Sequence, residues 1–267
     1  MAAITTANRI VVKVGTSTIT HDTGKTNLKT IERLCRVISD LWNAGKEVVL
    51  VTSGAVGAGL GRIGLSERPG DTATRQAMAA LGQCELMTLY CHFFGEYGRS
   101  CAQVLLTAED VENGARKENL VNCLSSLLKL GIIPVVNEND AVSVSELEGA
   151  NIGDNDNLSA IVAGLISADS LIMLTDIDGL YDKDPREHPD AVRIPVVVEI
   201  TDYIRSIAGG SGSKRGTGGM ATKLGAVEKA GASGIDTYIL GGHDPDLLYD
   251  LIDGGSVGTH FVSRPGS

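Results

Sequence analysis

Short runs of apolar, β-branched residues alternate along this chain with longer segments in which apolar residues recur every three or four positions. The short runs predict buried strands, and the longer segments predict helices with one buried face. Strands are predicted at residues 10–14, 48–52, 102–106, 132–136, 171–174 and 237–240, and helices at residues 31–42, 120–130 and 158–166. Strands that are apolar on both faces are typical of a mostly parallel sheet covered by helices on both sides.

Polar and glycine residues follow several of these strands directly. They are Gly15, Thr16 and Ser17, then Ser53 and Gly54, then residues 137–140, and finally Asp176. In open α/β sheets, ligands bind beyond the carboxyl ends of the strands. The chain is therefore expected to carry one site to which several strand ends contribute.

Residues 216–223 read Gly-Thr-Gly-Gly-Met-Ala-Thr-Lys, where the lysine opens an apolar, helix-like segment. Glycines allow backbone N–H groups to approach an anion closely, and a helix start with a lysine adds positive charge. This stretch indicates phosphate binding. It is not a P-loop, because the pattern Gly-x-x-x-x-Gly-Lys-Ser/Thr does not occur in the sequence.

Lys13 interrupts the run Ile10–Val14, which otherwise reads as a central strand. A lysine is rarely buried without a partner. One interpretation is an edge strand whose lysine points to solvent. The other is a lysine at the end of a central strand, directed at an anionic ligand.

Two Asp/Asn-rich stretches, residues 137–140 and 151–157, follow a strand and precede a helix. Turn formation and helix capping by Asp154 or Asn155 explain part of this density. A calcium loop is a poor fit, because the EF-hand spacing is absent. The surplus of carboxylates and amides favours hydrogen bonding to an amino-acid ligand, with one acid left over to hold lysines. Thr175-Asp176 could contact a nucleotide or form part of a turn.

Other enzyme classes find little support in the sequence. The pattern Gly59-x-Gly61-x-x-Gly64 matches a dinucleotide fingerprint only by letter, since it begins seven residues after the preceding strand. The five histidines show no zinc-binding spacing, and no Gly-x-Ser-x-Gly elbow of a hydrolase occurs.

Composition excludes further functions. A formal net charge of −10 argues against nucleic acid or an anionic membrane as the main partner. No apolar run is long enough to span a membrane and no signal peptide is evident, which predicts a cytoplasmic protein. The five cysteines, without any C-x-x-C pair and in mostly apolar surroundings, predict buried free thiols.

Several of these stretches, in this order, resemble the amino-acid kinase family and, within it, the glutamate 5-kinases. The resemblance extends over essentially the whole chain. The matching stretches are residues 11–17, 51–55, 105–107, 135–142, 153–160, 174–176, 216–223 and 256–259.

The resemblance implies a three-layer α/β/α sandwich with a mainly parallel central sheet and ATP-dependent phosphorylation of the γ-carboxylate of L-glutamate, the first step of proline biosynthesis. It implies a single domain over residues 1–267, with about 1–168 binding glutamate and about 169–267 binding ATP, and without the C-terminal PUA domain that many relatives carry. By motif position, the catalytic residues would be Lys13, Lys223 and Asp156.

The remaining roles are also implied by the resemblance. Glutamate would be bound by Ser53, Gly54, Asp140 and Asn155. ATP would be bound by Lys13, Thr175, Asp176, Thr217, Gly218, Gly219, Met220, Ala221, Thr222 and Lys223. Mg²⁺ would accompany the ATP phosphates, with no protein residue assigned as its ligand.

The resemblance further implies proline as a feedback inhibitor and a homodimer or homotetramer. Kinases of N-acetylglutamate, aspartate or carbamate are related alternatives. A Rossmann-type oxidoreductase and a catalytically silent sensor are more remote ones.

Overall fold

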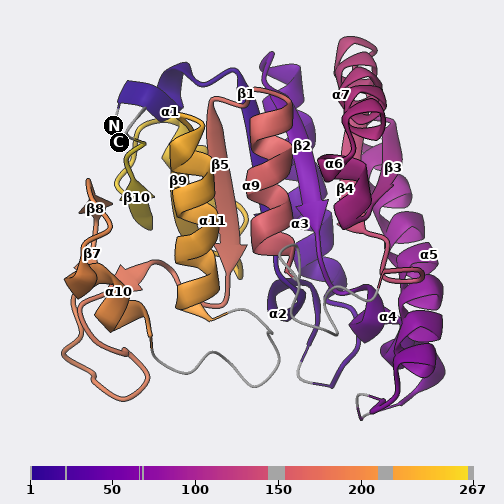
Figure 1. Ribbon diagram of the computed structural model, residues 1–267, viewed down its shortest axis with the longest axis horizontal. Helices are drawn as coiled ribbons and strands as arrows, with labels where there is room; N and C mark the ends of the chain where they lie inside the picture. Colours follow the sequence, from indigo (N-terminus) through magenta and orange to yellow (C-terminus); the bar gives the residue numbers. More distant parts are fainter. Residues whose placement is uncertain are drawn as a thin grey trace.

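In the computed structural model, eight strands form one sheet in the order β3-β4-β2-β1-β5-β9-β10-β8 (Figure 1). The six strands from β3 to β9 run parallel, and β10 is antiparallel to β9. The strands are β1 Arg9–Val14, β2 Glu47–Thr52, β3 Cys101–Leu106, β4 Ile133–Glu138, β5 Ser170–Thr175, β8 Val196–Val197, β9 Asp236–Gly241 and β10 Thr259–Phe261. A separate two-stranded sheet pairs β6 Leu180–Tyr181 with β7 Arg193–Ile194.

Helices connect most of the strands. They are α1 Ala2–Thr6, α2 Thr16–Ile19, α3 Leu28–Asn43, α4 Ala55–Ile63, α5 Thr72–Glu96, α6 Ala108–Glu112, α7 Gly114–Lys129, α9 Asn155–Leu165, α10 Asp202–Ala208, α11 Met220–Ala232 and α12 Leu247–Ile252. The structure describes residues 2–21, 23–65, 67, 69–143, 154–209 and 219–263.

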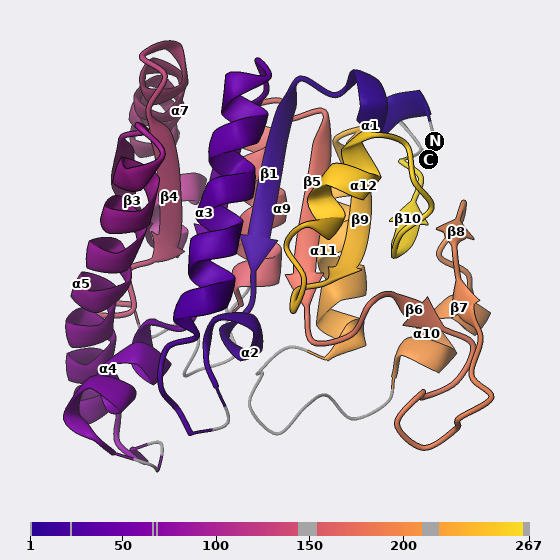
Figure 2. The ribbon, with the colours of Figure 1, turned by 180° about the vertical axis from the view of Figure 1, so that it is seen from behind.

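The helices lie in two layers, one on each face of the sheet. Helices α7, α9 and α11 cover the face seen in Figure 1, and α3, α5 and α12 cover the face seen in Figure 2. Two hydrophobic clusters correspond to these faces, because alternate residues of β1 point to opposite sides: Val12 belongs to one cluster and Val11 to the other. The three-layer α/β/α architecture predicted for this chain is confirmed.

All six predicted strands are present, each within two residues of its expected bounds. The longest helix, α5, was not predicted. Its residues are largely Ala, Gly, polar and aromatic, and they do not form a single apolar stripe. This helix packs against α4 through small residues instead. A Cβ atom on Gly82 would lie 1.8 Å from the carbonyl oxygen of Ala55.

Strand order places the site. The strand β1 lies between β2 and β5, so its carboxyl end is flanked by the carboxyl ends of both neighbours. Lys13 therefore belongs to a central strand and is only 6% exposed. The edge-strand interpretation of Lys13 is therefore wrong. A lysine is tolerated inside the sheet here because it forms an ion pair with a buried carboxylate.

The cysteine prediction is confirmed only in part. All five thiols are free, but only Cys35 is buried, while Cys84, Cys91 and Cys123 are exposed. Apolar neighbours in the sequence belong to helix faces that point away from these cysteines. In the part of the chain that the structure describes, no helix has the length and apolar character needed to cross a bilayer.

We expect Gly82→Ala to lower the free energy of unfolding by about 1–3 kcal/mol, because the added methyl group overlaps the backbone of α4. Gly95→Ala is the matched control in the same helix, since its Cβ would meet no atom within 4 Å. Urea unfolding of both variants measures the difference. Equal stabilities would show that α4 and α5 can separate without cost.

Candidate active site

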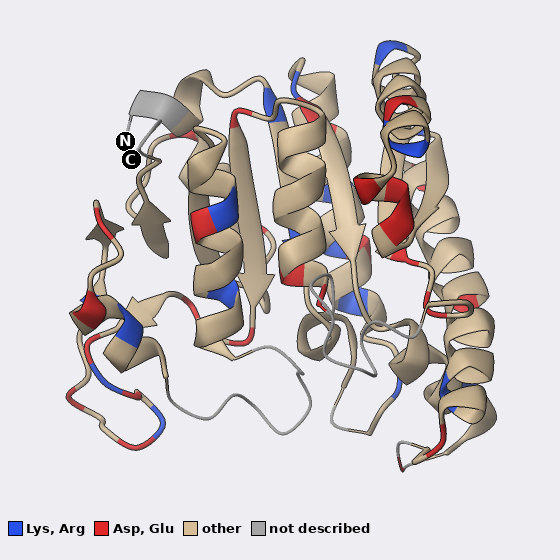
Figure 3. Ribbon diagram, viewed as in Figure 1, with Lys and Arg blue, Asp and Glu red and all other residues tan. Residues whose placement is uncertain are grey.

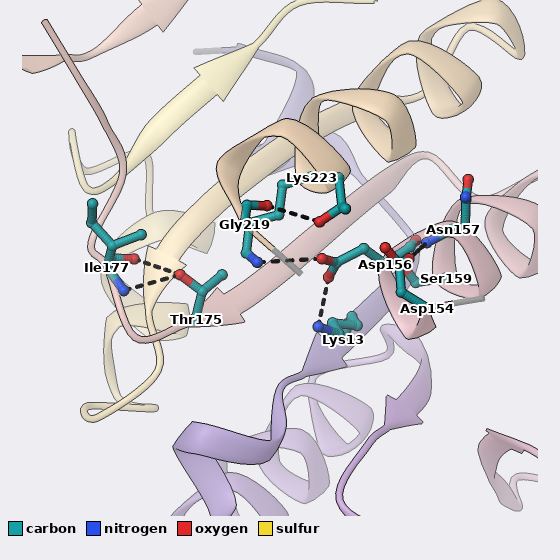
Figure 4. Close-up of polar contacts among 10 residues, drawn as sticks. Lys13, Asp154, Asp156, Asn157, Ser159, Thr175, Ile177, Gly219 and Lys223 are labelled. Atoms are coloured by element: carbon teal, nitrogen blue, oxygen red, sulfur yellow. Dashed lines mark hydrogen bonds and ion pairs between the residues drawn. The ribbon is translucent and has the colours of Figure 1, made fainter. Parts of the chain in front are cut away.

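The carboxylate of Asp156 lies between two lysine ammonium groups at the carboxyl edge of the sheet (Figure 4). Its Oδ1 is 2.5 Å from Lys13 Nζ, and its Oδ2 is 3.3 Å from Lys223 Nζ. The three side chains are 2–8% exposed. They come from β1, α9 and α11, so the fold brings together residues that are more than 60 positions apart in the chain.

Local sequence holds Asp156 in this position. The Oδ1 atom of Asp154 accepts a hydrogen bond from the backbone N–H of Asn157 at 2.8 Å, which caps the start of α9. Asp156 therefore lies in the first helical turn, where the helix dipole favours a negative charge. The hydroxyl of Ser159 donates to the backbone carbonyl of Asp156 at 2.6 Å. The prediction that Asp154 or Asn155 caps this helix is confirmed for Asp154.

The electrostatic balance at Asp156 favours the ionised carboxylate. Burial acts to raise its pKa, but the charges of Lys13 and Lys223 outweigh burial, and the net pKa is lowered. Asp156 is therefore an anion at neutral pH and orients the lysines rather than donating a proton. The carboxyl group of Asp154 lies close enough to act on the charges of all three side chains, and burial raises its pKa. The two ammonium groups suit an anionic ligand.

A cavity of about 430 Å³ opens beside Lys223. Its lining includes Asp176, Gly219, Met220 and Lys223, all four of which the sequence assigned to ATP. Gly219 precedes α11, and the backbone N–H groups at the start of this helix are available to an anion. The cavity is thus bordered by a helix start and by the end of β5.

The further residues that line this cavity include Tyr181, Lys183, Arg186 and His243. Sequence analysis missed them, because they lie in a turn-rich segment and in the loop after β9, without a phosphate-binding pattern. Basic and acidic positions alternate in the loop between β6 and β7, as Figure 3 shows at its lower left. The only feature of the sequence that could have indicated them is the presence of Lys183 and Arg186 shortly after Asp178-Gly179.

The other residues assigned to ATP lie in different settings. The hydroxyl of Thr175 donates to the carbonyl of Ile177 at 2.8 Å and accepts from its N–H, so Thr175 shapes the turn after β5. The hydroxyl of Thr222 donates to the carbonyl of Gly219 at 2.8 Å, and Ala221 is exposed. Thr217 and Gly218 lie outside the described residues, as does most of the glycine-rich segment.

On the other side of Lys13, the end of β2 forms a turn into α4. Gly54 has φ +92°, and a Cβ there would lie 3.0 Å from Ile19 Cδ1, so glycine is required. The preceding Ser53 is buried, and its N–H donates to the carbonyl of Val14 at 3.1 Å. This turn directs the first N–H groups of α4 toward the carboxyl edge of the sheet.

Asp140 and Ala55, the first residue of α4, line one cavity of about 610 Å³. Asn155 is 8% exposed, and its Oδ1 has no hydrogen-bond partner within the described part of the chain. The structure thus places the acidic residue near the start of α4, while the two lysines lie together elsewhere on the same edge.

Chemically, this edge offers two different environments. Lys13 and Lys223 can stabilise negative charge that develops between two anions, which is the main requirement of phosphoryl transfer. The segment after β4 supplies carboxylates and amides, which suit a ligand with donor groups. Among the described residues, no group of three or more His, Cys, Asp or Glu side chains is placed to hold a metal ion.

Known proteins are similar to this chain in sequence and in fold. A model of the amino acid kinase family matches residues 8–241. A protein of Clostridium perfringens named glutamate 5-kinase is 53% identical over 265 residues, which cover 99% of this chain and 98% of that protein. Proteins with the same name from Listeria welshimeri and Caldanaerobacter subterraneus are 50% and 52% identical, and the match covers 94% and 68% of their lengths.

Solved structures with low identity share the fold. A UMP kinase of Bacillus anthracis superposes with a TM-score of 0.66 at 16% identity and covers 97% of both chains. An isopentenyl phosphate kinase of T. acidophilum has a TM-score of 0.63 at 18% identity, with 95% of this chain and 99% of that one covered.

We expect Asp156→Asn to lower the free energy of unfolding at pH 7 by about 3–5 kcal/mol, because it leaves two buried lysines without a counter-charge. Since the folded pKa of Asp156 is lowered, its stabilisation is present above the unfolded pKa of about 3.9 and is lost as pH falls through the folded value.

Urea unfolding between about pH 3 and pH 7 checks both expectations. The loss of stability at acid pH should be smaller in Asp156→Asn than in the wild type. The control is Glu118→Gln on exposed α7, which should leave stability unchanged. A variant as stable as the wild type at pH 7 would contradict the ionic role of Asp156.

Proposed function

The chain belongs to the amino acid kinase family, and from that premise we infer that its two-lysine site carries the reaction of a glutamate 5-kinase. The reaction transfers the γ-phosphoryl group of ATP to the γ-carboxylate of L-glutamate, giving L-glutamyl 5-phosphate and ADP, the first step of proline biosynthesis. The observation that carries the site assignment is the buried triplet Lys13–Asp156–Lys223.

The acceptor needs no general base. The γ-carboxylate of glutamate is ionised at neutral pH and is already a nucleophile. The barrier is electrostatic, because this anion must approach a negatively charged phosphate. Lys13 and Lys223 contact one carboxylate and therefore flank the same small volume, where they can neutralise the charge on the transferred group.

Asp156 keeps both lysines in place before the substrates bind. It sits in a helix whose start is capped, so its carboxylate is fixed rather than free to rotate into solvent. When the phosphoryl group arrives, the ammonium groups can turn toward it while Asp156 still compensates part of their charge. The three residues thus act as a preorganised unit.

ATP fits the cavity beside Lys223. The phosphates would meet Lys223 and the N–H groups from Gly219 onward. Lys183 and Arg186 line the same cavity, where they form ion pairs with Asp190 and Asp184, and would have to exchange these partners to contact a phosphate. The nucleotide would extend toward Asp176. In this proposal, residues of about 169–267 bind ATP and residues of about 1–168 bind glutamate, with Lys13 contributing across the division.

Mg²⁺ would be held mainly by the phosphates of ATP and by water, since the protein residues assigned here include no metal ligand. When bound, it would neutralise phosphate charge. Proline as a feedback inhibitor, a homodimer or homotetramer and a cytoplasmic location stay predictions from the family resemblance, as does the absence of nucleic-acid and membrane partners.

Glutamate would bind along the edge from the lysines to the segment after β4. Its γ-carboxylate would lie near Lys13, and Ser53, Gly54 and Asn155 would hold the rest of the molecule. Asp140 would receive the α-ammonium group, which an acid does well and an amide poorly. A kinase of N-acetylglutamate has no such ammonium to recognise.

An ADP-release assay tests the reaction. We expect glutamate to support turnover, and N-acetylglutamate, aspartate and carbamate to support little. Lys13→Ala and Lys223→Ala should each lower kcat by about 10²–10³-fold, because each removes a cation that stabilises the transition state. Lys229→Ala, on the exposed face of the same helix as Lys223, is the control and should keep full activity. Near-normal kcat in both lysine variants would refute their assignment.

Asp140→Asn should raise the KM for glutamate at least about tenfold and leave the KM for ATP unchanged, because a charged hydrogen bond to the ammonium is lost. Asp176→Asn serves as the matched comparison, since the same chemical change on the nucleotide side should act on the KM for ATP. Steady-state kinetics with each substrate varied in turn gives both values. An equal rise in both KM values for Asp140→Asn would count against its role.

A further inference from the structure

We propose that Glu138 is a further substrate-binding residue, whose carboxylate receives the α-ammonium group of the amino-acid substrate together with Asp140. The inference rests on the proposed function, because it assigns a new residue to the same acceptor site. Glu138 is the last residue of β4 and lies two positions before Asp140. It is 2% exposed.

The pleat of the sheet places Glu138 on the same face as Lys13. Val136 belongs to the hydrophobic cluster under α7, α9 and α11, and side chains two positions apart share a face. Asn137 points to the opposite face, where its Nδ2 donates to Gln83 Oε1 of α5 at 2.9 Å. The side chain of Glu138 therefore starts on the α9 side of the sheet, as that of Lys13 does. Glu138 also lines the cavity of about 610 Å³ beside α4 and α5 that Asp140 lines, so the two acids border one space at the sheet edge.

Strand register places Glu138 at the edge where substrates bind. Lys13 pairs with Val51, and Val51 pairs with Val136, so these three residues form one row across the sheet. Glu138 lies two residues beyond this row, toward the carboxyl ends of the strands. Glu138 therefore lies two strands away from Lys13 across the sheet and two residues farther along the strand direction.

One oxygen of this carboxylate is engaged and the other is not. Oε1 accepts a hydrogen bond from the hydroxyl of Ser143 at 2.7 Å. Oε2 is buried and has no hydrogen-bond partner among the residues described. The Oδ1 atom of Asn155 is a second buried acceptor without a partner there. Buried acceptors are nearly always paired in folded proteins, so both point to a donor that the ligand brings.

Charge distribution identifies that donor. The lysine end of the site suits the γ-carboxylate, and the end beyond β4 carries Glu138 and Asp140. Asp154 lies between these ends, because its charge acts on Glu138 and also on both lysines. An amino acid lies favourably along this gradient with its ammonium at the acidic end. Burial raises the pKa of Glu138, the Ser143 hydroxyl lowers it, and the charge of Asp154 raises it further. A bound cation would offset both of the raising effects.

The test is Glu138→Gln, which keeps the size of the side chain and an oxygen that can accept from Ser143, but removes the charge. We expect glutamate binding to weaken roughly 10- to 100-fold with ATP affinity unchanged. Glutarate, which lacks the ammonium group, should bind the variant and the wild type equally. Isothermal titration of each ligand and the KM for glutamate provide the measurements.

Ser143→Ala is the matched control, because it releases Oε1 and leaves the carboxylate in place. The proposal predicts at most a few-fold change for this variant. An equal loss in Ser143→Ala and Glu138→Gln would mean that Glu138 only holds the loop, and would overturn the proposal. So would an equal loss of glutamate and glutarate binding in Glu138→Gln, or unchanged glutamate binding.

The two levels of inference fail differently. Wild-type protein without glutamate-dependent ADP release would refute the proposed function. Active wild type with a Glu138→Gln variant of normal KM for glutamate would refute only the role of Glu138. A thermal melt of each variant shows whether it is folded, and Glu138→Asp gives a second variant if the amide destabilises the strand. The shortened acid keeps the charge and should lose less affinity than the amide.

Discussion

The shared carboxylate of Asp156 is the interaction on which the site depends. Two lysines that are 6% exposed would be costly to bury alone, and a carboxylate that is 2% exposed would be costly as well. Together they are tolerable only in one geometry, which requires β1, α9 and α11 to meet at the same point. The requirement links the two halves of the chain, because Lys13 lies near one end of the sequence and Lys223 near the other. The two ammonium groups held at this point are what an incoming phosphoryl group needs.

The parallel sheet makes this meeting possible. The carboxyl ends of all the parallel strands lie at the same edge of the sheet, so short polar segments from distant parts of the sequence become neighbours there. Because β1 is central, Lys13 has the end of β5 with the nucleotide cavity on one side and the ends of β2 and β4 on the other. The two lysines of the triplet therefore lie between a cavity lined by both basic and acidic side chains and a segment at the end of β4 that carries Glu138 and Asp140. On the β4 side, the order from ammonium groups to carboxylates matches a substrate that is anionic at one end and cationic at the other.

Much of this arrangement could be predicted from the sequence, and the exceptions have physical reasons. The strands could be predicted because short apolar, β-branched runs such as Val48–Thr52 are typical of buried strands. The helix α5 was not, since it packs by close approach of glycines rather than by an apolar stripe. Local patterns could not pair Lys13 with Asp156, which only the family resemblance linked. Lys183 was missed, and Glu138 was not singled out within residues 137–140, because their significance depends on strand order and side-chain direction, which no single stretch of sequence displays.

The lysine pair explains the transfer but not the choice of acceptor. Any phosphoryl transfer to an anion gains from two cations at the reacting group, whatever molecule carries that anion. Fold alone does not select the acceptor either, since one fold hosts many activities. Selection must therefore come from groups that touch the part of the substrate that does not react. In this chain those groups include Glu138 at the end of β4 and Asn155 at the start of α9, each with a buried oxygen that has no donor among the residues described. An acceptor that brings an ammonium satisfies both the charge and the hydrogen bonds, and one that brings an acylated nitrogen leaves the charge uncompensated.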